Sequence, residues 1–254
     1  ISGIILPMLP DENIIPDINL TPYSIWLATV VVSGISYLSY LLKRYVFRES
    51  GVLVSGIVGG LYSSTATISV LARKSRNIHS GQATEYVAAM LLAVSMMFLR
   101  FMILISIFSR EIFLDIYPYL LIMALTAAAV AWFIHSRRKK TDVTENVDED
   151  EDGSNPLEFK VALIFAVLFV VFTVLTHYTL IYAGTGGLNL LSFVSGFSDI
   201  TPFILNLLQS TGTVAALVIT ACSMQAIVSN IMVNMCYALF FAGKGSKLRP
   251  WILG

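Results

Sequence analysis

Residues 51–72, GVLVSGIVGGLYSSTATISVLA, constrain the fold of this chain more than any other stretch. The segment is apolar and long enough to cross a bilayer as one helix. Its centre, however, holds Gly59 and Gly60, which weaken a helix, and hydroxyl side chains crowd the residues that follow. Helices that face lipid carry aliphatic side chains at such depth, so we expect a broken helix whose hydroxyls face protein, water or an ion. These hydroxyls belong to Ser63, Ser64, Thr65, Thr67 and Ser69.

A second segment, residues 191–208, resembles the first one in sequence. The two can be superposed without a gap, and the identical positions are then Gly60 and Gly196, Thr65 and Thr201, and Ile68 and Ile204. The second segment adds an acid, Asp199, within an apolar stretch. We interpret the pair as an internal repeat.

Composition places the chain in the membrane. Hydrophobic residues make up 56% of the 254 residues and charged residues 13%, whereas about a quarter of a soluble domain is charged. We expect an all-α, polytopic helical membrane protein with about five full spans and two broken or re-entrant helical segments. The expected full spans cover residues 23–46, 85–108, 113–135, 157–183 and 213–242.

The distribution of Lys and Arg predicts how these segments are threaded. If every apolar segment crosses, the basic residues outside the spans divide almost equally between the two faces. If residues 51–72 and 191–208 instead dip in and return, all of these residues except Arg110 lie on one face. The second arrangement obeys the positive-inside rule. It predicts a multi-pass protein of a prokaryotic plasma (inner) membrane, with the basic loops and the acidic loop 141–156 in the cytoplasm.

The same threading predicts an inverted repeat. Residues 1–140 form the first membrane repeat, with a truncated N-terminal helix; residues 141–156 form a flexible acidic loop; residues 157–254 form the second repeat. The two re-entrant segments enter from opposite faces, so their tips are expected near the bilayer midplane, as in many secondary transporters.

Arg100 lies near the middle of its span, where a charge needs a partner or a wet cavity. It either binds an anion or gates a carboxylate, or it forms a fixed ion pair or a clamp on backbone carbonyls. Asp199 is its candidate partner and also a candidate cation or metal ligand and proton carrier. Asn230 lies on a polar face of the last span, which a pore or hydrogen bonds between helices would explain equally. The hydroxyls of the first segment either coordinate an ion or bond back to carbonyls of their own helix.

No catalytic set appears in the sequence, and no cofactor or nucleic-acid motif is found. An intramembrane hydrolase would need a nucleophile with a base, or two aspartates, at membrane depth. We therefore expect a non-enzyme.

The runs SGISYLSY at residues 33–40 and GIVGGLYSSTAT at residues 56–67 resemble a prokaryotic membrane domain of unknown function. That domain commonly accompanies an MgtC/SapB-type domain, so the resemblance implies such a domain before this segment in the full polypeptide. The family's second segment carries Gly-x-x-Asp-x-Asp, whereas here Thr201 stands where the second acid would be. A site with two carboxylates is therefore not expected.

The first hypothesis is a transporter or channel for a small inorganic ion, with its site near the midplane between the two broken helices. The site would use Ser63, Ser64, Thr65, Thr67, Asp199 and Thr201, with Arg100 and Asn230 beside them. The alternative is a non-transporting regulatory membrane module, associated with MgtC-type proteins, that binds another membrane protein. The lipid bilayer, the ion and a second copy in a homodimer are the partners expected.

Overall fold

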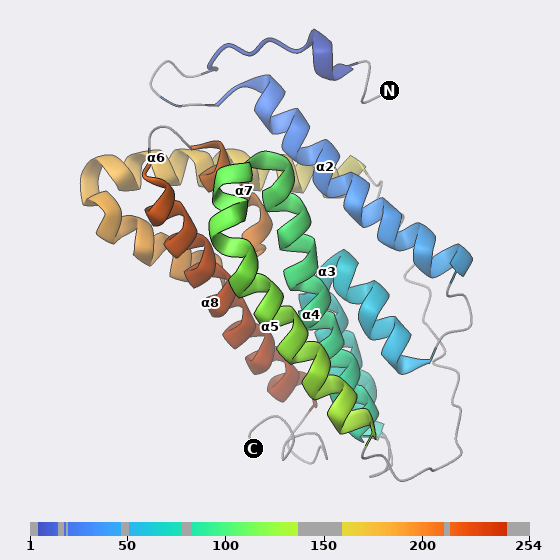
Figure 1. The fold of residues 1–254 in the computed structure, drawn as a ribbon. Helices are drawn as coiled ribbons and strands as arrows, with labels where there is room; N and C mark the ends of the chain where they lie inside the picture. The colour runs from blue at the N-terminus through green and yellow to red at the C-terminus, as the bar shows by residue number, and fades with distance from the viewer. Residues whose placement is uncertain are drawn as a thin grey trace. The chain divides into compact units, whose positions relative to one another are not determined.

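The computed structural model describes residues 5–14, 18, 20–46, 51–77, 83–136, 159–210 and 214–242. The predicted acidic loop 141–156 lies outside them. Within the described residues the regular elements are all helical, which confirms the all-α class (Figure 1). They are the short helices η1 (Leu6–Met8), η2 (Leu42–Val46) and η3 (Ser75–Asn77), and the α-helices α2 (Pro22–Leu41), α3 (Val52–Lys74), α4 (Ala83–Phe108), α5 (Arg110–Ser136), α6 (Phe159–Ser195), α7 (Ile200–Gln209) and α8 (Ala216–Ala242).

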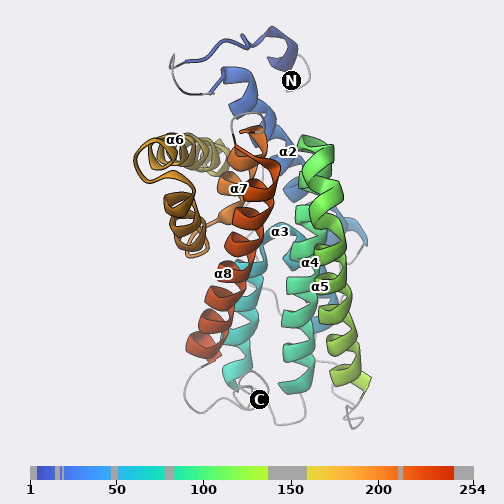
Figure 2. The ribbon, with the colours of Figure 1, turned by 60° about the vertical axis from the view of Figure 1, so that its left-hand side comes forward.

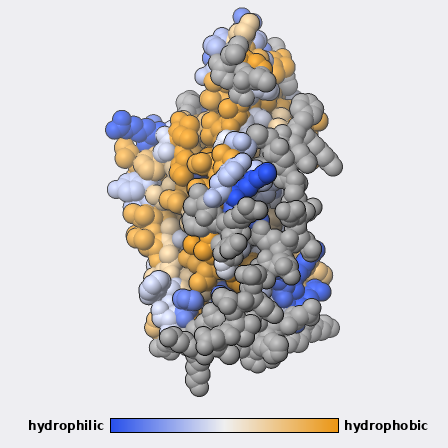
Figure 3. All heavy atoms as spheres, turned by 90° about the vertical axis from the view of Figure 1, so that its right-hand side faces the viewer, coloured by the Kyte–Doolittle hydropathy of each residue, from blue (hydrophilic) through white to orange (hydrophobic). Residues whose placement is uncertain are grey.

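By length and composition alone, six helices in the described part could cross a membrane, namely Pro22–Tyr45, Val52–Lys74, Ala83–Phe108, Arg110–Ser136, Ala162–Ser195 and Ala216–Ala242. Their outward side chains are apolar; on α5, for example, Ile122 and Leu125 are each 60% exposed. Apolar side chains also cover much of the coloured surface in Figure 3. Helices satisfy their own backbone hydrogen bonds, so such surfaces suit lipid. The protein is a multi-pass helical membrane protein.

Contacts divide the chain into two compact units. The first unit comprises Ile1–Gly34, Ile103–Ile116 and Asn155–Ile231, and the second comprises Ile35–Met102, Tyr117–Ser154 and Met232–Gly254. Each unit contains one of the two glycine-rich segments. The predicted repeats are halves of the sequence rather than compact units, and their inverted symmetry stays a prediction.

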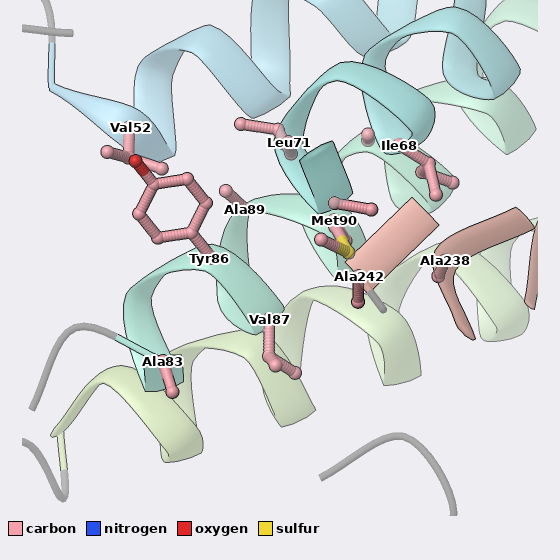
Figure 4. Packing of buried hydrophobic residues seen from close by; sticks show 12 residues of the cluster. Val52, Ile68, Leu71, Ala83, Tyr86, Val87, Ala89, Met90, Ala238 and Ala242 are labelled. Atoms are coloured by element: carbon pink, nitrogen blue, oxygen red, sulfur yellow. The ribbon is translucent and has the colours of Figure 1, made fainter. Parts of the chain in front are cut away.

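In the second unit, α3 is a helical hairpin and not a straight rod. Ser63 is extended, with φ −157° and ψ 107°, inside an otherwise helical segment. A side chain built on Gly59 would lie 2.5 Å from Oγ1 of Thr67, whereas eight residues of a straight helix span about 12 Å. Val52 and Leu71, from opposite ends of α3, share one buried cluster with Tyr86 of α4 (Figure 4). The segment therefore turns back at Ser63, as its sequence predicted.

The glycines of the first arm of α3 let it approach α4 closely. A Cβ on Gly60 would lie 2.5 Å from Cα of Ala93, and one on Gly56 would collide with the carbonyl of Ala89. Small residues bring helix backbones together in this way in membranes, where dispersion forces replace the hydrophobic effect between helices. The glycines thus serve packing as well as the break.

In the first unit, the second glycine-rich segment is also broken. Gly184 has φ 60° and ψ −153°, a conformation that glycine adopts readily and other residues do not. It separates a first part of α6 from an arm at residues 185–195, and a turn at residues 196–199 leads to the ten-residue α7. The arm begins earlier than the expected start at residue 191, because Gly186 and Gly187 remain helical. Figure 2 shows the change of direction within α6.

We predict that Gly60→Ala destabilises the protein. The added methyl group meets backbone atoms of Ala93 that cannot rotate away, and overpacking of this kind costs roughly 1–3 kcal/mol. Gly34→Ala in α2 is the matched control, because nothing lies within 4 Å of its Cβ position. Thermal unfolding in detergent should show a lower midpoint for Gly60→Ala than for the wild type, and an unchanged midpoint for Gly34→Ala. Equal midpoints for both variants would contradict the packing role.

Candidate functional site

The tip of the first hairpin is organised by Ser63. Its Oγ accepts a hydrogen bond from the backbone N–H of Ala66 at 3.3 Å, so Ser63 is the N-cap of the second arm of α3. Ser64 is buried, while Thr65 and Thr67 are partly buried close by. Ser69 bonds back to the carbonyl of Thr65, the local bond expected of a hydroxyl in a membrane helix. Ser69 is thus bonded within its own helix, whereas the other four hydroxyls lie at the break or just after it.

Arg100 of α4 reaches this tip. Its Nη1 donates to the carbonyl oxygen of Tyr62 at 2.7 Å. Tyr62 ends the first arm, and the last carbonyls of a helix lack partners within it and carry partial negative charge. Arg100 therefore acts as a clamp on a helix end, one of the interpretations drawn from the sequence. Its pairing with Asp199, which lies in the other unit, stays a prediction.

The tip of the second segment is organised by Asp199. Its Oδ1 accepts from the backbone N–H of Thr201 at 2.9 Å, so Asp199 is the N-cap of α7. Thr201 is buried, whereas the carboxylate of Asp199 is exposed. Asp199 thus has a structural role that Asn would also fill, and a charge that Asn would lack.

The polar face of α8 holds the first arm of this segment. Asn230 Nδ2 donates to the carbonyl of Gly196 at 3.1 Å, and Ser229 Oγ donates to the carbonyl of Phe193 at 2.7 Å. One and two turns earlier on α8, Gln225 accepts from Ser192 and Cys222 donates to Asn189. Asn230 is therefore engaged in a hydrogen bond between helices, the second of the two explanations for this polar face.

The two tips share a construction. When Gly60 is placed on Gly196, Ser63 coincides with Asp199, and both are N-caps. Gly196 also packs as Gly60 does, since a Cβ there would lie 2.9 Å from the backbone N of Asn230. The sequence analysis does not predict these N-caps. A Ser or Asp shortly after a glycine in a broken helix is the signal that would identify them.

The lengths of the arms set the depth of the tips. Residues 52–62 and 185–195 form the first arms, and each arm is about 16 Å long at 1.5 Å per residue. The hydrocarbon core of a bilayer is about 30 Å thick. An arm that starts at the membrane surface therefore places its tip near the middle of the bilayer. Each tip has an N-cap side chain that accepts through oxygen, and hydroxyl groups nearby. The carbonyls that end each first arm accept hydrogen bonds from side chains of a neighbouring helix.

The described residues contain no group of three or more His, Cys, Asp or Glu that could hold a metal ion. Asp199 as a metal ligand therefore stays a prediction.

Comparison with known proteins identifies relatives but no activity. A family model described as "Domain of unknown function (DUF4010)" matches residues 30–242. An uncharacterized protein of Aquifex aeolicus (strain VF5) is 26% identical over 212 residues, which cover 80% of this chain and 87% of that protein. No solved structure matches the chain.

We predict that Arg100→Met loosens the first hairpin. The variant keeps an unbranched side chain but leaves the Tyr62 carbonyl without this donor, which should cost about 1 kcal/mol in a membrane helix bundle. Arg110→Met, at the exposed start of α5, is the control for loss of charge. Hydrogen exchange of the amides near Ser63 should rise in Arg100→Met alone. An equal rise in both variants would argue against the clamp.

Proposed function

Because the chain belongs to the family described as a domain of unknown function, DUF4010, we propose its function from its structure: a membrane transporter or channel for a small inorganic ion. The observation that carries the proposal is the break at Ser63 within an apolar segment, with a polar cap on each side of it. Non-helical backbone at that depth is tolerated only where protein buries it or where it lines a cavity.

The second segment strengthens the proposal. Its turn at residues 196–199 carries the exposed carboxylate of Asp199 on an arm about 16 Å below Gly184. A carboxylate at mid-membrane depth is costly in lipid, so it faces water, an ion or another polar group. Broken helices whose ends address ions and substrates are the usual binding elements of secondary transporters.

We assign roles to the residues as follows. The hydroxyls of Ser63, Ser64, Thr65 and Thr67 offer oxygen ligands at the first tip, and Asp199 and Thr201 do so at the second. Arg100 and Asn230 hold the hairpins through backbone carbonyls, and Arg100 also sets the local charge. No residue is assigned a catalytic role, so we propose a non-enzyme in a prokaryotic plasma membrane with its basic loops in the cytoplasm.

One observation favours the alternative, a non-transporting regulatory module. Arg100, Ser229 and Asn230 all donate to backbone carbonyls, which is how polar residues act when they only hold helices together. In that case an MgtC/SapB-type domain of the same polypeptide, a second copy of the chain or another membrane protein would be the partner.

Flux through the purified protein in liposomes separates the two functions. We predict a leak or exchange of an inorganic ion that falls by about tenfold or more in Asp199→Asn, a loss equivalent to about 1.4 kcal/mol. Because Asn caps a helix as well as Asp does, this variant removes the charge and keeps the fold. Asp115→Asn, on the exposed face of α5, is the matched control and should leave flux unchanged.

The contrary outcome is equally specific. If the folded wild-type protein passes no ion from a panel of monovalent and divalent cations and anions, and co-purifies with a membrane partner, the transporter proposal fails and the regulatory module replaces it.

A further inference from the structure

A buried polar cluster lies in the first unit, between α6 and α7. It consists of Thr173 and Thr176 on α6 and Asn206 on α7, whose side chains are 5%, 2% and 3% exposed. Asn206 Nδ2 donates to Thr173 Oγ1 at 2.8 Å, which joins the two helices. The proposed ion site does not include any of the three residues.

The orientation of the Asn206 amide follows from its neighbour. Thr173 donates its only hydroxyl hydrogen to the carbonyl of Phe169 at 2.8 Å. Its oxygen can therefore only accept from Asn206, so the NH₂ group faces Thr173 and Oδ1 points away from it. Oδ1 is buried and has no hydrogen-bond partner among the residues that the structure describes.

Thr176 provides a second open oxygen. It follows Thr173 by three residues and therefore shares the same face of α6. Thr173 bonds back to the carbonyl four residues earlier, as threonine usually does in membrane helices. Thr176 does not, and its Oγ1 is also buried without a partner within the described part of the chain.

The surroundings make these open oxygens costly. Phe172 and Phe203 meet edge to face at 5.6 Å between ring centroids beside the cluster, and Phe169 and Phe203 are fully buried. A polar atom in such a low-dielectric place is almost always satisfied by a partner. Asn206 Oδ1 and Thr176 Oγ1 are therefore each expected to have a polar or positively charged partner.

We propose that the cluster binds a monovalent cation of the size of Na⁺, with Asn206 Oδ1 and Thr176 Oγ1 as ligands and Thr173 Oγ1 orienting the Asn206 amide. Both ligands are neutral, which suits a single charge; a divalent cation is normally bound with carboxylates. The choice of an ion over a buried water molecule rests on the proposed function. If this choice is right, the protein carries a cation site built from residues that do not belong to either hairpin tip.

Binding of ²²Na⁺ to the purified full chain in detergent tests the site without requiring transport. We expect saturable binding of a single ion per chain and a rise in the unfolding midpoint when NaCl replaces choline chloride, because a ligand of the folded state stabilises it. Thr176→Val keeps the shape and removes the oxygen, so Na⁺ affinity should fall by about tenfold or more. Asn206→Leu should abolish binding.

Thr179→Val, one turn further along α6 and only partly buried, is the matched control and should bind Na⁺ as the wild type does. No Na⁺ binding by the wild-type protein, or equal affinity in Thr176→Val, would overturn the inference and leave a buried water as the occupant. If the wild type binds Na⁺ but passes no ion in liposomes, the site stands and the transport proposal falls. If it passes another ion and binds no Na⁺, the reverse holds.

Discussion

The structure depends on one constraint: backbone groups freed by a broken helix must find partners inside a medium that offers none. Each of the two hairpin tips exposes carbonyls on one side and N–H groups on the other. Freed N–H groups donate to the side chains of Ser63 and Asp199, which are N-caps in the same segments. The freed carbonyls accept hydrogen bonds from a neighbouring helix, from Arg100 for α3 and from Ser229 and Asn230 for α6. The C-terminal end of α8 is capped in the same way, because Arg76 donates to the carbonyl of Phe241.

Close packing makes this solution possible. The side chains that clamp the carbonyls are effective only because the broken helices lie against their neighbours at backbone distance, which Gly56, Gly60 and Gly196 permit. Glycine therefore acts in two ways in this protein. At Gly184 it supplies a left-handed conformation, and within the arms it supplies space. The hydroxyls and the carboxylate at the tips then lie at the ends of arms of about 16 Å.

Sequence patterns predicted the architecture well because hydrophobicity and charge act through composition and length. The helical class, the multi-pass character and the break near Gly59 and Gly60 all follow from what a bilayer accepts. The sequence predicts too late a start for the second hairpin arm, because three glycines in four residues indicate a break at all of them, whereas only Gly184 leaves the helix. Asn230 could be read as pore lining or as a helix contact, because a polar face looks the same from the sequence in either case.

The sequence by itself determined that this chain crosses a membrane, that two of its segments are interrupted, and that Ser63 and Asp199 occupy equivalent positions. These properties depend on neighbouring residues or on composition, so the sequence shows them directly. Only the tertiary structure decided which carbonyl Arg100 clamps, that both equivalent residues are N-caps, and that Asn206 and Thr173 meet across two helices with an oxygen left open. Hydrogen bonds between residues 30 to 40 positions apart depend on how helices are rotated and stacked, and no local pattern fixes that rotation.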